Sequence, residues 1–251
     1  MELYKKYITE HLNEDGTLGG LDYNVPKDFN FAYDVVDYFG KTEPDRRAMI
    51  WVADDESDRT FTFGDIMRGS NQTANYFKSL GIKKGDKVLM ILRRHYEFWF
   101  AIVALHKIGA IVIPATDQLK KKDITYRFEK AGVSAIICTA DGSILDEAVQ
   151  AVEEYKDSIK VKIVVNGECN CWSKFNENVK KFSAEFNRPT GDDATFSDDL
   201  MLMYFTSGTT AYPKIVAYDY TYPLGHFTTA KWWHNVDPNG VHFTVAETGW
   251  A

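Results

Sequence analysis

The sequence predicts an α/β protein with layered, mostly parallel sheets and flanking helices. Between residues 84 and 165, short apolar runs alternate with segments of helix length. Gly81 follows the helix predicted just before this part, and Gly109 follows a helix within it, as expected of left-handed cap residues. Because parallel strands need crossover connections of this length, the alternation favours a parallel sheet with right-handed crossovers.

The elements follow from the N-terminus in a regular order. A helix is predicted near residues 28–39, and two strands at 50–53 and 59–63 precede a helix that runs from Phe63 to about residue 80. The alternating part then comprises strands at 87–92, 110–114, 134–138 and 161–165, with helices at 96–108, 122–131 and 142–155 between them.

A change of composition divides the chain. Residues 187–199 contain Pro189, Gly191 and four aspartates, which predicts a linker or exposed loop. The predicted parts are therefore an α/β region at 1–186, this loop, and a unit at 200–251, and it stays open whether the last unit belongs to a different layer. Within that unit we expect strands at 200–205, 215–218 and 241–246, and a helix at 221–233.

Charge and composition exclude several classes of protein. With 29 basic and 36 acidic residues the net charge is −7, so no electrostatic footprint for nucleic acid is present. The N-terminus lacks the apolar region of a signal peptide, and no window approaches the ~20 apolar residues of a membrane span. We therefore predict a cytoplasmic protein with reduced thiols at Cys138, Cys169 and Cys171.

The segment from Phe205 to Lys214 predicts a phosphate-binding loop. It is rich in small and hydroxyl residues and closes on a lysine directly after an apolar run at 200–204. Glycine allows close backbone approach, N–H and hydroxyl groups donate hydrogen bonds to oxyanions, and the lysine supplies charge. A Walker A loop does not fit, because Pro213 and Ile215 stand where that motif needs a glycine and a hydroxyl.

This segment resembles the signature of the adenylate-forming enzymes, the family of acyl-CoA synthetases, luciferases and peptide-synthetase adenylation domains. The signature is [YF]-T-S-G-[ST]-[ST]-G-x-P-K, and the chain matches every specified position except Ala211, where the family has glycine. If that position needs a positive φ, alanine costs about 1–2 kcal/mol. Residues 84–88 and 104–114 resemble upstream family blocks, and residues 114–119 and 246–251 most resemble the medium-chain acyl-CoA synthetase branch.

The resemblance implies an activity and a set of site residues. Family members convert a carboxylate and ATP to an acyl-adenylate and pyrophosphate, with Mg²⁺ bound, and then transfer the acyl group to coenzyme A. By the resemblance, Lys214 is catalytic and balances charge, and Trp250 lies beside the acyl pocket. The residues implied to bind ATP phosphates are Thr206, Ser207, Gly208, Thr209, Thr210 and Lys214.

The resemblance also implies that this chain is the first half of the family's large N-terminal domain. The family's adenine, ribose and Mg²⁺ segments and its C-terminal domain find no match here, so we expect the chain alone to be inactive and to expose a face suited to self-association. An acetyl-CoA synthetase, a carrier-loading adenylation domain and a non-catalytic binding or regulatory protein are the alternatives. We expect His226 to be structural and Trp232 and Trp233 to be core residues.

Overall fold

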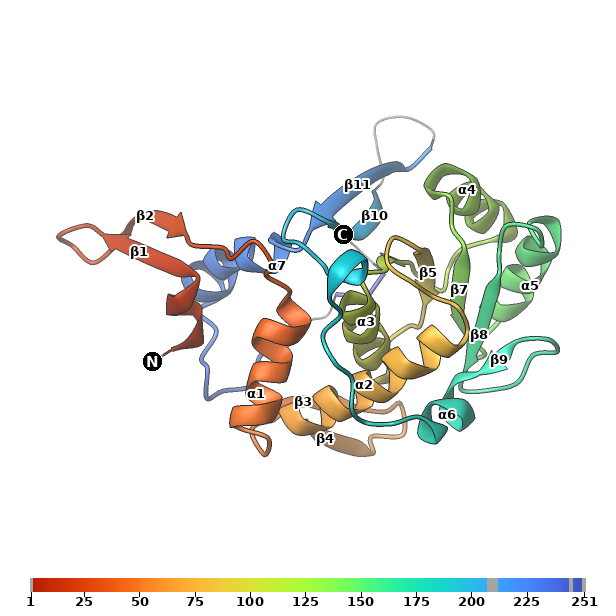
Figure 1. The fold of residues 1–251 in the computed structure, drawn as a ribbon, viewed down its shortest axis with the longest axis horizontal. Helices are drawn as coiled ribbons and strands as arrows, with labels where there is room; N and C mark the ends of the chain where they lie inside the picture. The colour runs from red at the N-terminus through yellow and green to blue at the C-terminus, as the bar shows by residue number, and fades with distance from the viewer. Residues whose placement is uncertain (1, 207–211, 244–245, 250–251) are drawn as a thin grey trace.

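The structure is a computed structural model that describes residues 2–206, 212–243 and 246–249. Within these residues, the largest element is a seven-stranded sheet with the order β11-β10-β6-β5-β7-β8-β9 (Figure 1). Neighbouring strands are parallel except for β10 and β11, which are antiparallel. The predicted fold class, an α/β protein with a mostly parallel sheet, is therefore confirmed. The strands are β5 Lys87–Ile91, β6 Ile111–Pro114, β7 Ala135–Thr139, β8 Val161–Val165, β9 Ser173–Lys174, β10 Leu200–Thr206 and β11 Lys214–Asp219.

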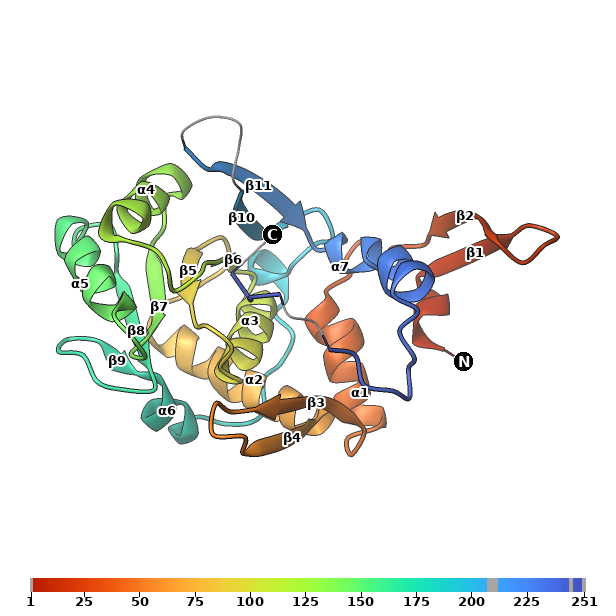
Figure 2. The same cartoon turned by 180° about the vertical axis from the view of Figure 1, so that it is seen from behind.

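Two helical layers cover this sheet, and each meets every second residue of its strands (Figures 1 and 2). On β5, Val88 and Met90 pack in the core beneath α2 and α3, whereas Leu89 and Ile91 pack in the core beneath α4 and α5. Strands buried on both faces produce the continuous apolar runs seen in the sequence. The helices are α2 Phe63–Ser79, α3 Glu97–Ile108, α4 Lys121–Ala131 and α5 Ile144–Glu154.

Local side-chain and backbone chemistry fixes the ends of these helices. Thr62 and Asp65 form a capping box at the start of α2, in which each side chain accepts from the other residue's backbone N–H. Gly109 ends α3 with φ of +87°, and Gly81 follows α2 with φ of +94°. Both glycines therefore occupy the left-handed conformation that the sequence predicted.

The N-terminal region contains a hairpin that the sequence did not predict. After a 3₁₀ turn, η1 Leu3–Lys6, strands β1 Ile8–Leu12 and β2 Leu18–Tyr23 pair antiparallel and project from the body (Figure 1). A π-helical segment η2 Ala32–Asp37 and helix α1 Tyr38–Thr42 come next. The predicted strand pair then follows as β3 Arg47–Val52 and β4 Asp58–Thr62.

Buried ionic contacts join this region to the main helices. The Lys107 ammonium group is fully buried and lies 2.7 Å from Asp37 Oδ1, 2.9 Å from Ser70 Oγ and 2.6 Å from Asn71 Oδ1. Burial lowers the pKa of Lys107 and raises the pKa of Asp37, while their attraction opposes both changes. The four side chains thus hold η2, α2 and α3 together.

The segment after residue 186 differs from the expectation in several ways. Strand β10 pairs with β6, with Leu202 opposite Val112, so the unit after the loop belongs to the same sheet and not to another layer. The boundaries predicted at 187–199 and 200–251 stay a prediction. Short elements complete this region: α6 Phe175–Asn178, η3 Val179–Lys181 and η4 Gly191–Asp193.

The last fifty residues depart furthest from the sequence-based interpretation. The predicted helix at 221–233 is interrupted and forms α7 Tyr222–Gly225 and a π-helical segment η5 Thr229–Trp233. Trp233 is 82% exposed and Trp232 is 37% exposed, so the expectation that both are core residues was wrong. Among the described residues of 241–246 there is no strand, because none of them pairs with another strand.

Candidate functional site

The two ends of the predicted phosphate loop meet at one edge of the sheet. Thr206, the last residue of β10, lies opposite Lys214, the first residue of β11. Because β10 is parallel to β6, this edge is also where β5, β6 and β7 end, which is where open α/β sheets bind ligands. Thr206 is half-buried and Lys214 is exposed. Ser207, Gly208, Thr209 and Thr210 lie outside the described residues, as does Ala211.

Strand alternation gives these two residues a common face. In the register Thr206–Lys214, Tyr204–Val216 and Leu202–Tyr218, all six side chains project to the same side of the sheet. Leu202 and Tyr204 pack with the core beneath α2 and α3, which identifies that side. The hydroxyl of Thr206 and the ammonium group of Lys214 are therefore presented together.

Helix α4 supports the base of the loop from the opposite face. The hydroxyl of Tyr126 donates a hydrogen bond of 3.0 Å to the carbonyl oxygen of Pro213, and its ring stacks on Tyr212 at 5.3 Å between centroids. The guanidinium of Arg127 lies 4.8 Å from the ring centre of Phe205. The sequence did not predict these roles of Tyr126 and Arg127, because nothing in a helical segment indicates which distant residues its side chains contact.

Residues 246–249 return to the same edge. The hydroxyl of Thr248 donates to the carbonyl oxygen of Arg93, which follows β5, and Gly249 is packed against the backbone of Ala115 and Thr116, which follow β6. Gly249 N–H donates to Glu247 at 3.0 Å. This segment thus lies across the ends of two central strands. Trp250, implied to lie beside the acyl pocket, is outside the described residues.

A second polar group lies farther along the edge, at the ends of β7 and β8. His95 Nε2 is 2.9 Å from Thr139 Oγ1 and 3.1 Å from Asp141 Oδ2, and its Nδ1 is 3.3 Å from the Asn166 side-chain nitrogen. His95 lies just before α3. Its contacts connect the loop after β5 to the ends of β7 and β8.

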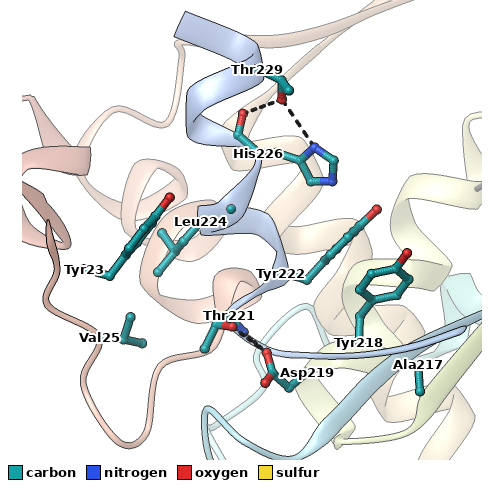
Figure 3. A pocket seen from close by; sticks show the side chains of 11 residues that line it. Tyr23, Val25, Ala217, Tyr218, Asp219, Thr221, Tyr222, Leu224, His226 and Thr229 are labelled. Atoms are coloured by element: carbon teal, nitrogen blue, oxygen red, sulfur yellow. Dashed lines mark hydrogen bonds between the residues drawn. The ribbon is translucent and has the colours of Figure 1, made fainter. Parts of the chain in front are cut away.

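Beyond β11 the surface contains a groove of about 800 Å³, shown in Figure 3. Its walls are the end of β11, α7, the start of η5 and two residues from the N-terminal region, Tyr23 and Val25. His226, which the sequence suggested was structural, lines it with Tyr222, and the two rings meet edge to face at 4.6 Å. Burial, with nearby Tyr222, Tyr218 and Glu247, raises the pKa of Tyr204 to about 12.

These features define a class of protein: an α/β enzyme fold with a lysine-ended loop at the carboxyl edge of a parallel sheet. The model of the AMP-binding enzyme family matches residues 36–250. The chain therefore belongs to the AMP-binding enzyme family.

Similar proteins of known sequence are acyl-CoA synthetases. The mitochondrial acyl-coenzyme A synthetase ACSM3 of Homo sapiens is 30% identical over 250 residues, covering 96% of this chain and 41% of the relative. The mitochondrial acyl-coenzyme A synthetase ACSM5 of Rattus norvegicus is 32% identical over 234 residues, covering 90% and 39%. The chain thus spans about two fifths of the length of these relatives.

Solved structures share the fold. The acyl-CoA synthetase of Brucella canis gives a TM-score of 0.75 at 23% identity and covers 89% of this chain and 39% of that one. The anthranilate CoA ligase AuaEII, solved in complex with anthranoyl-AMP, gives a TM-score of 0.65 at 22% identity. The match covers 84% of this chain and 38% of that one.

The expectation of a cytoplasmic location was wrong. It rested on the absence of a recognisable signal, whereas the curated relatives are mitochondrial proteins. Separately, among the described residues there is no helix with the length and apolar character needed to cross a bilayer. The three cysteines are free, and burial raises the pKa of Cys138 to about 12.

Proposed function

We propose that this protein is an ATP-dependent acid–CoA ligase that forms an acyl-adenylate from a carboxylate and then transfers the acyl group to coenzyme A. The observation that carries the proposal is the pairing of Thr206 with Lys214 at the carboxyl edge, in a chain whose family match spans residues 36–250. Relatives named acyl-coenzyme A synthetases support it.

The residues present fit a polyphosphate. A half-buried hydroxyl and an exposed ammonium group flank the loop on one face, and Tyr126 fixes the backbone beside it. Attack of a carboxylate on the α-phosphate places charge on phosphate oxygens, and positioning and electrostatics supply most of the catalysis. The residues proposed to hold ATP are Thr206, Ser207, Gly208, Thr209, Thr210 and Lys214.

Mg²⁺ and coenzyme A complete the set of molecules that the proposed reaction uses. The described residues contain no group of three His, Cys, Asp or Glu side chains that could hold a metal ion. We therefore name no Mg²⁺ ligand among the described residues. Coenzyme A belongs to the proposal through the family, and we assign it no residue.

We propose a medium-chain or related carboxylic acid as the acyl substrate. The support is the resemblance of residues 114–119 and 246–251 to that branch, together with acyl-coenzyme A synthetases among the relatives. Their mitochondrial names also support a mitochondrial location for this protein.

We further propose that the 251 residues alone do not complete the reaction. Relatives are more than twice as long, since this chain covers 41% of ACSM3. Exposed side chains at Trp233 (82%) and Phe243 (82%) support the expected self-association. Measurable ATP–pyrophosphate exchange by the purified chain would contradict the first proposal, and a strictly monomeric protein in sedimentation would contradict the second.

ATP binding tests the proposed site directly. Titration calorimetry with ATP should detect binding that Lys214→Ala weakens by about 10–100-fold, because a charge-assisted contact contributes about 1.5–3 kcal/mol. Lys5→Ala, an exposed lysine in η1 at the N-terminal end of the molecule (Figure 1), is the control and should bind like the unaltered protein. Equal ATP affinity in the two variants would exclude the phosphate role of Lys214.

A further inference from the structure

Two cations flank the end of the β10–β11 ribbon, one on each face. Lys214 projects to the side of α2 and α3, as does Thr206. Phe205 packs on the other side, with the core beneath α4 and α5. There the guanidinium of Arg127 lies 4.8 Å from the centre of the Phe205 ring. Arg127 therefore contacts the residue that immediately precedes Thr206.

Arg127 is buried without an acidic partner. Only 8% of the residue is exposed, and its buried Nε has no acceptor among the residues that the structure describes. Its Nη1 donates at 2.9 Å to the carbonyl oxygen of Asp123, one turn earlier in α4. The Asp123 carboxylate instead accepts from Lys120 N–H at 3.0 Å and caps the helix. Burial lowers the pKa of Arg127, and attraction to Asp123 opposes that change only in part.

Other cations of this fold are paired. The buried ammonium group of Lys107 lies 2.7 Å from Asp37 Oδ1. The arginines that have an acidic partner, all of them more exposed than Arg127, are Arg46, Arg68, Arg93 and Arg188. Burial of a guanidinium is costly, and one hydrogen bond to a carbonyl oxygen with one aromatic ring does not replace its hydration. A charge that is left unneutralised in this way is suited to attract an anion.

We propose that Arg127 is a positioning residue for the phosphates of the nucleotide. Its buried charge attracts the polyphosphate to the end of the ribbon, while Lys214 attracts it from the opposite face. The inference rests on the proposed function and adds a second cation to its site. Because the charge of Arg127 lies under Phe205 and away from water, salt screens it less than it screens an exposed lysine. Arg127 thus acts through its electric field and through the contact with Phe205.

Calorimetric titration of the full chain with ATP tests the role of the charge. Arg127→Gln keeps a donor for the Asp123 carbonyl oxygen but removes the charge, so ATP affinity should fall about tenfold. Arg127→Lys restores the charge and should recover most of that affinity. Arg68→Met is the matched control, because it removes the charge of an exposed arginine on α2 and should leave ATP affinity unchanged.

A stability measurement separates this electrostatic role from a structural one. Arg127→Met replaces the buried guanidinium with an apolar side chain, so the midpoint of urea unfolding should not fall. Its ATP affinity should nevertheless drop as in Arg127→Gln. A residue that serves only packing would give the reverse result, with a lower midpoint and an unaltered ATP affinity.

The outcomes distinguish the inference from the proposed function. Unchanged ATP affinity in Arg127→Gln, beside the loss expected of Lys214→Ala, overturns the inference and leaves the proposed function standing. A loss that Arg127→Lys does not recover, or a lower unfolding midpoint in Arg127→Met, also overturns it. Absence of ATP binding to the unaltered protein contradicts the proposed function and the inference together.

Discussion

The hydroxyl of Tyr126 on α4 donates a 3.0 Å hydrogen bond to the carbonyl oxygen of Pro213. This bond crosses from a helix to the residue just before Lys214, and the same tyrosine ring stacks on Tyr212. One side chain therefore fixes the backbone from which the lysine projects. The position of the ammonium group depends on a helix that carries none of the predicted phosphate contacts.

Removing this hydroxyl should weaken ATP binding without unfolding the protein. Tyr126→Phe keeps the ring contacts and loses one hydrogen bond, which contributes about 0.5–1.5 kcal/mol, so ATP affinity should fall by about 5-fold. Calorimetric titration measures the change. Tyr155→Phe, on the other side of α4 against Phe128, is the control and should leave ATP affinity unaltered. Equal loss in both variants would mean that Tyr126 acts through general stability.

The buried Lys107 should be one of the costliest positions to change. Lys107→Met leaves the Asp37 carboxylate buried without its partner, which should lower the free energy of unfolding by about 3–5 kcal/mol. The double variant Lys107→Met with Asp37→Leu should recover most of that loss. Urea unfolding measures both. The exposed pair of Lys5 and Glu2 provides the control, because Lys5→Met should leave stability unchanged. If Lys107→Met had the same free energy of unfolding as the unaltered protein, the stabilising role assigned to Lys107 would be contradicted.

His106 should make stability fall as the pH drops below 6.5. Burial lowers its pKa from 6.5 to about 3, so the unfolded chain binds a proton in that range and the folded chain does not. Stability contributed by the neutral ring is present above pH 6.5 and is lost as the pH falls. Between pH 7.5 and 5.5 the loss should be about 1.4 kcal/mol.

His106→Phe keeps a ring at this buried position beside Tyr220 and removes the titrating group. Urea unfolding at pH 7.5 and 5.5 measures the free energy of unfolding. Its decrease between the two pH values should be about 1.4 kcal/mol smaller for the variant than for the unaltered protein. Identical pH dependence in the two proteins would rule out His106 as the group responsible.

Gly249 is expected to accept no side chain. An added Cβ would overlap the backbone of Ala115 and Thr116, so Gly249→Ala should displace the segment across the strand ends and cost about 1–3 kcal/mol of stability. At Gly225 an added Cβ meets nothing within 4 Å. Gly225→Ala is therefore the control and should leave thermal unfolding nearly unchanged. Equal unfolding temperatures for the two variants would contradict the packing described for Gly249.

The sequence predicted the central α/β layers well because their signals are local. Apolar runs and end glycines such as Gly109 each act within a few residues, and the strand at Val161–Val165 was predicted to the residue. The N-terminal hairpin escaped prediction because β1 and β2 mix polar and apolar residues without alternation and are stabilised largely by distant partners.

For the candidate site, the sequence located the loop but not its surroundings. Thr206 and Lys214 were predicted from a contiguous motif, and their assigned roles stay predictions. Tyr126 and Tyr23 could not be found in that way, since each lies far along the chain from the residues it meets. The exposure of Trp233 was misjudged because the helix expected to bury it breaks after Gly225.

The contact between Glu10 and Lys231 spans 221 positions of the chain. During synthesis, the N-terminal hairpin leaves the ribosome long before the segment that contains Lys231 has been made. The hairpin therefore cannot form this contact until most of the chain has been synthesised. Contacts of such long range are also slow to form. The packing of this hairpin on α7 and η5 therefore forms only after residues 224–232 have been synthesised, and the hairpin's polar and apolar contacts to them form late in the folding of the chain.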